Sequence, residues 1–312
     1  MKNYFFVNPA AGQGRGTEKL VERIEKISKR LGETSFIYHT KDIGDGEIKA
    51  RETAAALNGE PARFYACGGD GTLNEIINGI IGFSNVSAGC IPTGTGNDMI
   101  RNFPGAGDFS DIEAQLRGTL HRIDLIRYAG VISGVFKERY CANMFNIGFD
   151  CNVVELAGRL KKKPLISGSV AYLLAVAGMF IRKKGIALKL TEGEEILLDG
   201  EVLLCSIANG SYCGGGICSS PQASVDDGWF DINIVKDVPR RTFLRLFPKY
   251  QKGTHLQIPQ APAIITVKRS RSAVLEPKER TFFLCADGEI EPAEKVEFRL
   301  APAAVDFILP AS

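Results

Sequence analysis

The first 125 residues alternate short apolar segments with segments of helical periodicity, and this rhythm restricts the fold of the chain most. The predicted strands and helices follow one another in the order 4–7, 17–31, 35–38, 45–57, 63–67, 73–81 and 88–91. Such alternation is typical of a parallel sheet that is covered by helices on both faces. We therefore predict an N-terminal α/β domain whose ligands bind beyond the carboxyl ends of its strands.

From about residue 140 the pattern changes to one strand after another, separated by turns that carry glycine and proline. The predicted strands are 140–147, 186–190, 201–208, 230–235, 264–267, 281–285 and 295–300. Only the segments 169–182 and 240–250 have a helical pattern. This succession is typical of an antiparallel β-sandwich. We therefore predict two domains, 1–127 and 128–300, with a catalytic cleft between them.

The composition excludes several classes of protein. The net charge is only +2, so no global attraction to nucleic acid is expected. The eight cysteines form no CxxC pair and only three histidines are present, which argues against zinc and for free thiols in a reducing cytosol. The longest apolar stretch, 170–181, is shorter than the ~20 residues that cross a bilayer, and the N-terminus does not read as a signal peptide. We expect a cytoplasmic protein, soluble or peripheral at the inner face of the membrane.

The strongest local signal is the segment 68–72, with the sequence GGDGT, between the predicted strand 63–67 and the next helix. Its glycines would allow backbone N–H groups to approach a phosphate chain, and the helix N-terminus adds positive potential. An ordinary strand-to-helix turn is the structural alternative. An aspartate that faces phosphates needs a cation or a hydrogen-bonding neighbour. We therefore interpret Asp70 as an organiser of magnesium or of a nucleotide pocket.

Two further turns follow predicted strands. The segment 92–98, PTGTGND, follows the strand 88–91, and the segment 8–12, NPAAG, follows the first strand. Asn97 and Asp98 could instead cap a short helix. Because the carboxyl ends of parallel strands meet at one edge of a sheet, all three turns are expected to converge there.

These motifs, taken in their order along the chain, resemble those of the diacylglycerol kinase catalytic family. This family includes sphingosine and ceramide kinases and bacterial lipid kinases. The match consists of Asn8-Pro9-x-x-Gly12, Gly68-Gly69-Asp70-Gly71-Thr72-x-Asn74-Glu75, Pro92-x-Gly94-Thr95-Gly96-Asn97-Asp98, Ile123-Asp124 and Asp287-Gly288-Glu289. The resemblance implies an N-terminal domain similar to those of NAD kinase and phosphofructokinase, with a β-sandwich behind it. It also implies that a final strand, 304–309, returns to the first domain, which then includes residues 301–312.

The resemblance further implies ATP as phosphoryl donor, with Mg²⁺, and names the residues around the nucleotide. The implied contacts are Asn8, Gly12, Thr40, Gly68, Gly69, Asp70, Gly71, Thr72, Leu73, Asn74 and Thr95. Asp70, Asp98 and Asp124 are implied to form an acidic network around the phosphates. Arg15 stands near the place where relatives can carry a lysine.

Two Asp-Gly turns in the second half have both a structural and a functional interpretation. Asp287-Gly288-Glu289 reads as a hairpin turn, whereas the resemblance places it in the cleft as the source of a general base. Glu289 is the preferred base and Asp287 its partner, and the choice stays open. The segment 219–229 resembles a family loop that holds a structural magnesium through Asp227 and through the backbone carbonyls of Ser224 and Trp229.

The predicted function is transfer of the γ-phosphoryl group of ATP to the hydroxyl of diacylglycerol or a similar lipid. The product would be phosphatidate, a precursor in phospholipid biosynthesis. Phosphatidylglycerol, sphingoid bases and undecaprenol-like alcohols are alternative acceptors. NAD kinase and a non-catalytic lipid-binding regulator are alternative functions, although the acidic residues are intact. Basic clusters at 161–163 and 182–184 could contact anionic lipids or flank a core helix. A homodimer is expected from the resemblance.

Overall fold

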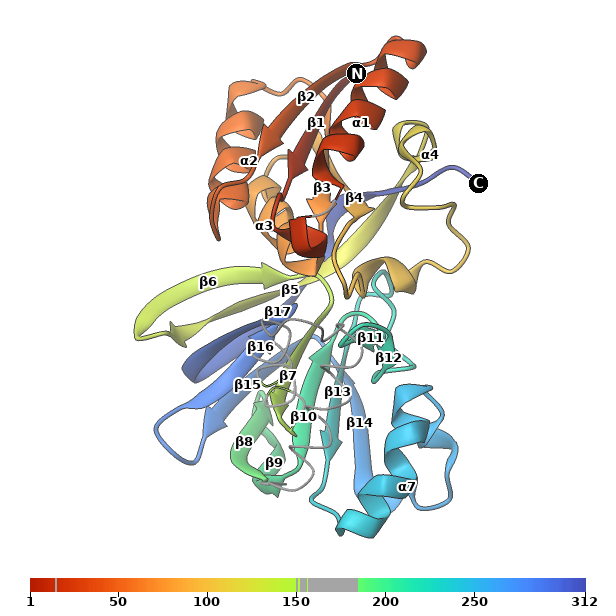
Figure 1. Cartoon of the computed structure of the whole chain (residues 1–312). Coiled ribbons are helices and arrows are strands. Elements are labelled where there is room, and N and C mark those ends of the chain that lie inside the picture. The colour runs from red at the N-terminus through yellow and green to blue at the C-terminus, as the bar shows by residue number, and fades with distance from the viewer. Residues whose placement is uncertain (15, 150, 152–155, 157–184) are drawn as a thin grey trace. The chain divides into compact units, whose positions relative to one another are not determined.

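The computed structural model describes residues 1–14, 16–149, 151, 156 and 185–312. Arg15 and the segments 161–163, 169–182 and 182–184, on which predictions were made, lie outside the described residues. The chain forms two compact units (Figure 1): unit 1 comprises Met1–Asp124 and Pro302–Ser312, and unit 2 comprises Leu125–Ala301. Among the described residues, no helix is both long and apolar enough to cross a lipid bilayer.

Unit 1 is built on a parallel sheet, as predicted. Its strands lie in the order β2-β1-β3-β4-β17. The strands β1, β2 and β3 are parallel to one another, and β4 continues the parallel order beside β3. Their bounds are Lys2–Val7 for β1, Thr34–His39 for β2, Ala62–Gly68 for β3 and Val86–Pro92 for β4.

Helices follow the strands of unit 1. They are η1 (Ala11–Gly14), α1 (Thr17–Leu31), α2 (Asp45–Ala56), α3 (Asp70–Ile80), η2 (Met99–Asn102) and α4 (Ile112–Leu116). The predicted apolar stripe of α1 buries Leu20 and Ile24 against side chains of the sheet such as Phe5. The helix ends at Gly32, whose φ of 70° is the left-handed conformation that glycine adopts most readily.

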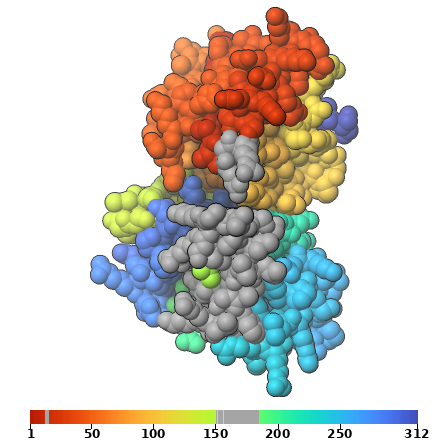
Figure 2. Space-filling view, in the orientation of Figure 1, coloured from red at the N-terminus to blue at the C-terminus, as the bar shows by residue number. Residues whose placement is uncertain are grey.

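The C-terminal segment completes unit 1. Strand β17 (Glu289–Leu309) is one continuous strand, where two separate strands were predicted, and its Phe307 pairs with Ala88 of β4 in parallel. Phe307 is fully buried and stacks on Phe103, with ring centroids 5.3 Å apart. The last residues, in blue, emerge on the surface of unit 1 (Figure 2).

Unit 2 is the predicted β-sandwich, and its strands are mostly antiparallel. One path runs β14-β13-β10-β7-β16-β17; β15 joins β17 to β8, and β9 pairs with β8. The bounds are β7 (Met144–Gly148), β8 (Ile186–Glu192), β9 (Glu195–Val202), β10 (Leu204–Ala208), β11 (Tyr212–Cys213), β12 (Ile217–Cys218), β13 (Phe230–Val235), β14 (Ile265–Ser270), β15 (Ser272–Pro277) and β16 (Phe282–Ala286). The helical elements are α7 (Arg240–Gln251), η3 (His255–Gln257) and α8 (Ala261–Ile264).

The central strands of unit 2 are buried on both faces. One face, with side chains such as Phe145 and Ile207, belongs to the sandwich core. The other face, with side chains such as Leu204 and Val235, packs against Phe243 and Leu246 of α7 and neighbouring residues. A strand that is buried on both faces reads as a continuous apolar run, which explains why these strands could be found from the sequence.

A β-hairpin forms over residues 119–141, of which only 140 and 141 were predicted to lie in a strand. Strands β5 (Thr119–Ile132) and β6 (Val135–Cys141) are joined by Ser133 and Gly134, whose φ angles are 54° and 78°. Positive φ at both central residues is the signature of a type I′ turn, the geometry that best matches the strand twist.

The contribution of the returning strand can be measured by replacing Phe307 with alanine. Phe307→Ala should lower the free energy of unfolding by about 3–5 kcal/mol, because it empties a fully buried site. Urea denaturation measures the change, and Phe136→Ala, at a side chain that is 72% exposed, is the control and should have little effect. Equal effects of the two substitutions would contradict the packing described here.

Candidate functional site

The three glycine-rich turns of unit 1 lie side by side at one edge of the sheet. Their strands are in register, with Val7 opposite Cys67 and Gly68 opposite Pro92. The backbone N–H of Asn8 donates to the carbonyl of Cys67 at 3.0 Å. The N–H groups of Thr93 and Gly94 both donate to the carbonyl of Gly68, at 2.9 and 3.1 Å. Backbone hydrogen bonds thus tie each turn to its neighbour.

Two glycines allow this close approach. A Cβ at Gly94 would lie 2.4 Å from the Cα of Gly69, and a Cβ at Gly12 would lie 2.7 Å from the carbonyl oxygen of Thr93. Gly12 also has a φ of 60°, which side-chain-bearing residues rarely adopt. Since the clashing atoms are backbone atoms, no rotamer change could relieve the contact. The glycine pattern is therefore a requirement of turn-to-turn packing.

Asn8 links the first turn to α3. Its Oδ1 accepts a hydrogen bond from the N–H of Ala10 at 2.9 Å, and its Nδ2 donates to Oγ1 of Thr72 at 3.0 Å. The side chains of Thr72, Leu73 and Asn74, which were predicted to contact nucleotide, are buried. We infer that the backbone at the start of α3 is what a phosphate chain would meet.

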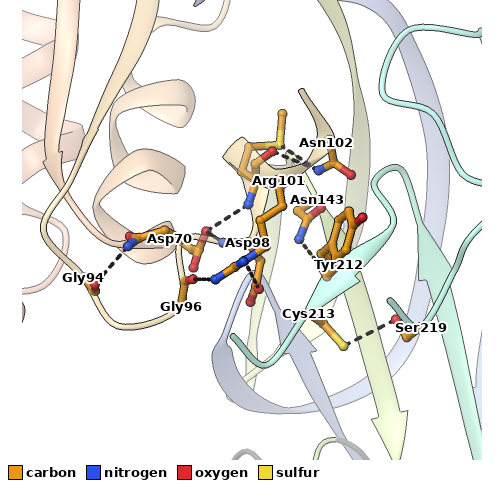
Figure 3. Close-up of polar contacts among 12 residues, drawn as sticks. Asp70, Gly94, Gly96, Asp98, Arg101, Asn102, Asn143, Tyr212, Cys213 and Ser219 are labelled. Carbon is orange, nitrogen blue, oxygen red and sulfur yellow. Dashed lines mark hydrogen bonds and ion pairs between the residues drawn. The ribbon is translucent and has the colours of Figure 1, made fainter. Parts of the chain in front are cut away.

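Asp70 holds the third turn in place (Figure 3). Its Oδ1 accepts hydrogen bonds from the N–H groups of Asp98 and Met99, at 2.7 and 3.2 Å. Asn97, with a φ of 53°, donates from Nδ2 to the carbonyl of Gly94 at 2.9 Å. Arg101 lies 3.6 Å from Asp98, which places one cation among these acids. The structure therefore brings Asp70 and Asp98 together.

Asp124 has a different surrounding. It is 3% exposed, and its Oδ1 accepts a hydrogen bond of 2.7 Å from the N–H of Ala303 in β17. Ala303 has a φ of 47°, an unusual conformation for a residue with a side chain. Asp124 thus stabilises the point at which the C-terminal segment enters unit 1.

Glu75 fixes the loop that follows the second strand, β2, although the sequence had given no role for this residue. Its carboxylate accepts hydrogen bonds from the N–H groups of Gly44 and Gly46, at 2.8 and 3.0 Å, at the start of α2. The loop before α2 begins at Thr40, whose N–H donates to the carbonyl of Val7 at 2.9 Å. Two features of the sequence could have indicated this role: the glutamate at the end of the glycine-rich motif and the Gly-x-Gly sequence at 44–46.

In unit 2 the turn that carries Asp287 is fixed by backbone groups. Oδ1 of Asp287 accepts from the N–H groups of Asn143 and Met144, each at 3.1 Å, and Oδ2 accepts from that of Ala142 at 2.9 Å. The thiol of Cys141 also donates to Oδ1 at 3.1 Å. Burial, and then the Asp287 charge, raise the pKa of Cys141 well above its usual value, so the thiol stays protonated.

Glu289 is held differently from Asp287. It is the first residue of β17 and is partly exposed, two residues after Asp287. Asp287 and Gly288 have φ angles of 46° and 92°, so the turn is tight and left-handed. The turn therefore carries two partly exposed carboxylates, of which Asp287 is anchored by three backbone N–H groups.

Arginine side chains from another part of unit 2 contact the segment that was predicted to hold a structural magnesium. Asp227 accepts a hydrogen bond from the N–H of Trp229 at 3.1 Å through Oδ1, and its Oδ2 forms an ion pair with Arg269. Among the described residues, no group of three or more His, Cys, Asp or Glu side chains is placed to hold a metal. With its carboxylate engaged by a guanidinium, the set Ser224, Asp227 and Trp229 does not fit a divalent cation here.

Comparison with known proteins identifies the family. The diacylglycerol kinase catalytic domain matches residues 2–128, and the YegS C-terminal NAD kinase beta sandwich-like domain matches residues 143–309. A diacylglycerol kinase of Staphylococcus saprophyticus is 30% identical over 256 residues, covering 81% of this chain and 79% of that protein. One from Mycobacterium tuberculosis is 26% identical over 307 residues, covering 97% and 93%. The chain belongs to the diacylglycerol kinase family, which includes YegS-like lipid kinases.

Solved structures agree on the fold. A putative diacylglycerol kinase from Bacillus anthracis superposes with a TM-score of 0.73 at 22% identity, covering 99% of this chain and 96% of that one. Yeast NADH kinase superposes with a TM-score of 0.51 at 9% identity, covering 100% and 84%. The predicted fold class is thereby confirmed. Membership of a kinase family implies ATP as the co-substrate.

The role of Glu75 can be tested by Glu75→Gln. The amide has one acceptor oxygen where the carboxylate has two, so one of the N–H groups of Gly44 and Gly46 loses its partner. A lost charge-assisted hydrogen bond of about 1.5–3 kcal/mol in the loop should weaken MgATP binding about tenfold or more. Calorimetric Kd values measure this. Glu52→Gln, at a mostly exposed glutamate of α2, is the control, and equal Kd values for both variants would refute the assignment.

Proposed function

We propose that the protein transfers the γ-phosphoryl group of ATP to the hydroxyl of a diacylglycerol-type lipid and yields a phosphatidate-type product. The observation that carries the proposal is the convergence of three glycine-rich turns, organised by Asp70, in a chain of this family. The phosphatidate would supply phospholipid biosynthesis. Since the acceptor is a bilayer lipid, we further propose peripheral contact with the membrane surface.

In this proposal the nucleotide lies along the sheet edge. The N-terminus of α3, together with the glycine-rich turns beside it, would bind the phosphates, because helix N-termini and glycine-rich turns favour anions. Magnesium would enter with ATP as part of the co-substrate. Asp70 would keep the turn 93–98 in its binding conformation through its bonds to Asp98 and Met99. Phosphoryl transfer needs mainly such positioning and charge stabilisation.

We assign proton acceptance to Glu289 and positioning to Asp287. A general base must accept the proton of the acceptor hydroxyl. Both oxygens of Asp287 accept backbone N–H groups, which gives this carboxylate a structural task, and Glu289 is the other carboxylate of the same turn. Glu289 would accept the proton as the lipid oxygen attacks the γ-phosphorus, and Asp287 would keep the turn in place.

An apolar cavity in unit 2 supports a lipid acceptor. It is small, with about 30 Å³ of internal space, and it supports the acceptor through the chemistry of its walls and not through its volume. It is lined between the sheet and α7 by Leu204, Val235, Phe243, Leu246 and His255 among others. His255 is 2% exposed, and burial lowers its pKa to about 4, so the ring is neutral. Apolar walls of this kind favour an acyl chain over the charged NAD molecule.

The cavity also lies at a suitable place along β7 of unit 2. The Asp287 turn is bonded to residues 142–144 at the start of this strand, and Phe149, just past its end, lines the cavity. Five residues of a strand span about 16 Å. The apolar cluster that contains both Met144 and Phe149 joins the two places, so apolar side chains continue from the Asp287 turn to the cavity.

The acceptor is tested by transfer of radiolabelled phosphate from ATP to lipids in mixed micelles, with NAD as a parallel acceptor. We expect label in phosphatidic acid. Label in NADP alone would make the protein an NAD kinase, and no transfer to any acceptor would favour a non-catalytic lipid-binding regulator. Asp70→Ala should abolish transfer while leaving the circular dichroism spectrum unchanged, since it removes the bonds that hold the turn 93–98.

The division of roles predicts different kinetics for two conservative variants. Glu289→Gln should lower kcat by about 10²–10⁴-fold, without change in the KM for ATP, because it removes the proton acceptor. Asp287→Asn should lower the melting temperature as well as kcat, because an amide cannot accept from all of the backbone N–H groups that the carboxylate binds. If Asp287→Asn gave the larger loss of kcat with an unchanged melting temperature, the two assignments would be reversed.

A further inference from the structure

The turn 224–229 of unit 2 carries an arrangement that the phosphoryl-transfer proposal does not use. We infer that Arg269 and Arg271 close this turn and take the place of the structural divalent cation that the family resemblance implies. The inference rests on contacts within unit 2 and does not depend on the acceptor of the kinase.

Asp227 is already satisfied by protein groups. The N–H of Trp229 donates to Oδ1 of Asp227, and the guanidinium of Arg269 pairs with Oδ2. A divalent cation requires oxygen ligands and would be repelled by a guanidinium on the same carboxylate. Arg269 thus supplies the positive charge that the cation would bring, and its planar donor group suits a carboxylate.

Arg269 also faces a second acid. Asp231 in β13 lies opposite Arg269 in β14, and its Oδ1 is 3.8 Å from Nε of Arg269. Asp231 is 2% exposed, and burial raises its pKa to about 6, with Arg269 acting in the opposite direction and Asp227 adding to the rise. One guanidinium therefore lies between two carboxylates, which is the charge arrangement expected around a bound cation.

Arg271 holds the rest of the turn. Its Nε donates to the carbonyl of Gly228 at 3.0 Å, and its guanidinium lies 4.2 Å from the ring centroid of Trp229. Arg269 lies 5.7 Å from the same ring. A backbone carbonyl, a carboxylate and an aromatic face of one turn are thus bound by two side chains, one at the end of β14 and one directly after it.

The closed turn is connected by hydrogen bonds to the Asp287 turn. Oγ of Ser211 donates to the carbonyl of Ala223 at 2.9 Å. The next residue, Tyr212, accepts a hydrogen bond at its carbonyl from Nδ2 of Asn143 at 2.6 Å (Figure 3). The N–H of Asn143 in turn donates to Asp287. The residue before the closed turn is therefore linked by hydrogen bonds to a residue that binds Asp287.

The test uses the full-length protein in the absence of lipid and ATP. Wild-type protein is dialysed against buffer that contains magnesium and then against metal-free buffer. Atomic emission should then find less than one magnesium ion per chain. Its melting temperature should be the same in EDTA and in excess Mg²⁺. Arg269→Gln should lower the melting temperature in EDTA by about 2–4 °C, and Mg²⁺ should reverse the loss, because Asp227 and Asp231 become available to the cation.

Arg299→Gln is the matched control, because Arg299 belongs to the same unit, is 66% exposed and lies 4.0 Å from Glu297. It should leave the melting temperature and its response to Mg²⁺ unchanged. One magnesium per chain in the wild-type protein, with a lower melting temperature in EDTA, would overturn the inference. An Arg269→Gln variant that melts like the wild type in EDTA would overturn it as well. Neither readout requires kinase activity, so failure here is distinct from failure of the proposed function.

Discussion

The contact between the backbones of Gly69 and Gly94 is the constraint on which the site of unit 1 depends. Each of these residues follows a strand of the parallel sheet, and any Cβ at Gly94 would collide with the chain at Gly69. The shared carbonyl of Gly68 holds the two turns at this distance. The N-terminus of α3 is thereby placed beside the turn 93–98 at one sheet edge, where we propose that the phosphate chain binds.

Carboxylates act as fixed anchors for backbone in this protein. Asp70 binds the turn 93–98, Glu75 binds the start of α2, Asp124 binds Ala303, and Asp287 binds residues 142–144. A buried carboxylate is stable only when such donors replace its lost hydration. Acidic residues of a kinase motif therefore need not all touch substrate. Glu289, the second carboxylate of the Asp287 turn, is the one to which we assign chemistry.

Much of the fold could be predicted from the sequence, because the strand–helix rhythm and the glycine turns are local signals. The hairpin formed by β5 and β6 could not, since β5 carries His121, Arg122, Asp124 and Arg127, and part of its pairing is with β17, which is remote in sequence. The same limit applies to roles within the site. The backbone N–H groups that bind Asp287, and the arginine that binds Asp227, are distant from these acids in sequence. They meet the carboxylates only in the folded chain.

The central claim is that the three glycine-rich turns of unit 1 and the neighbouring loop 40–46 bind the nucleotide together. Hydrogen–deuterium exchange tests this claim most directly. The exchange of backbone amides is compared with and without MgATP, in the absence of lipid. The account predicts slower exchange in segments 8–12, 40–46, 68–72 and 93–98 at the same nucleotide concentration. Protection of only one of these segments, or protection confined to unit 2, would contradict it.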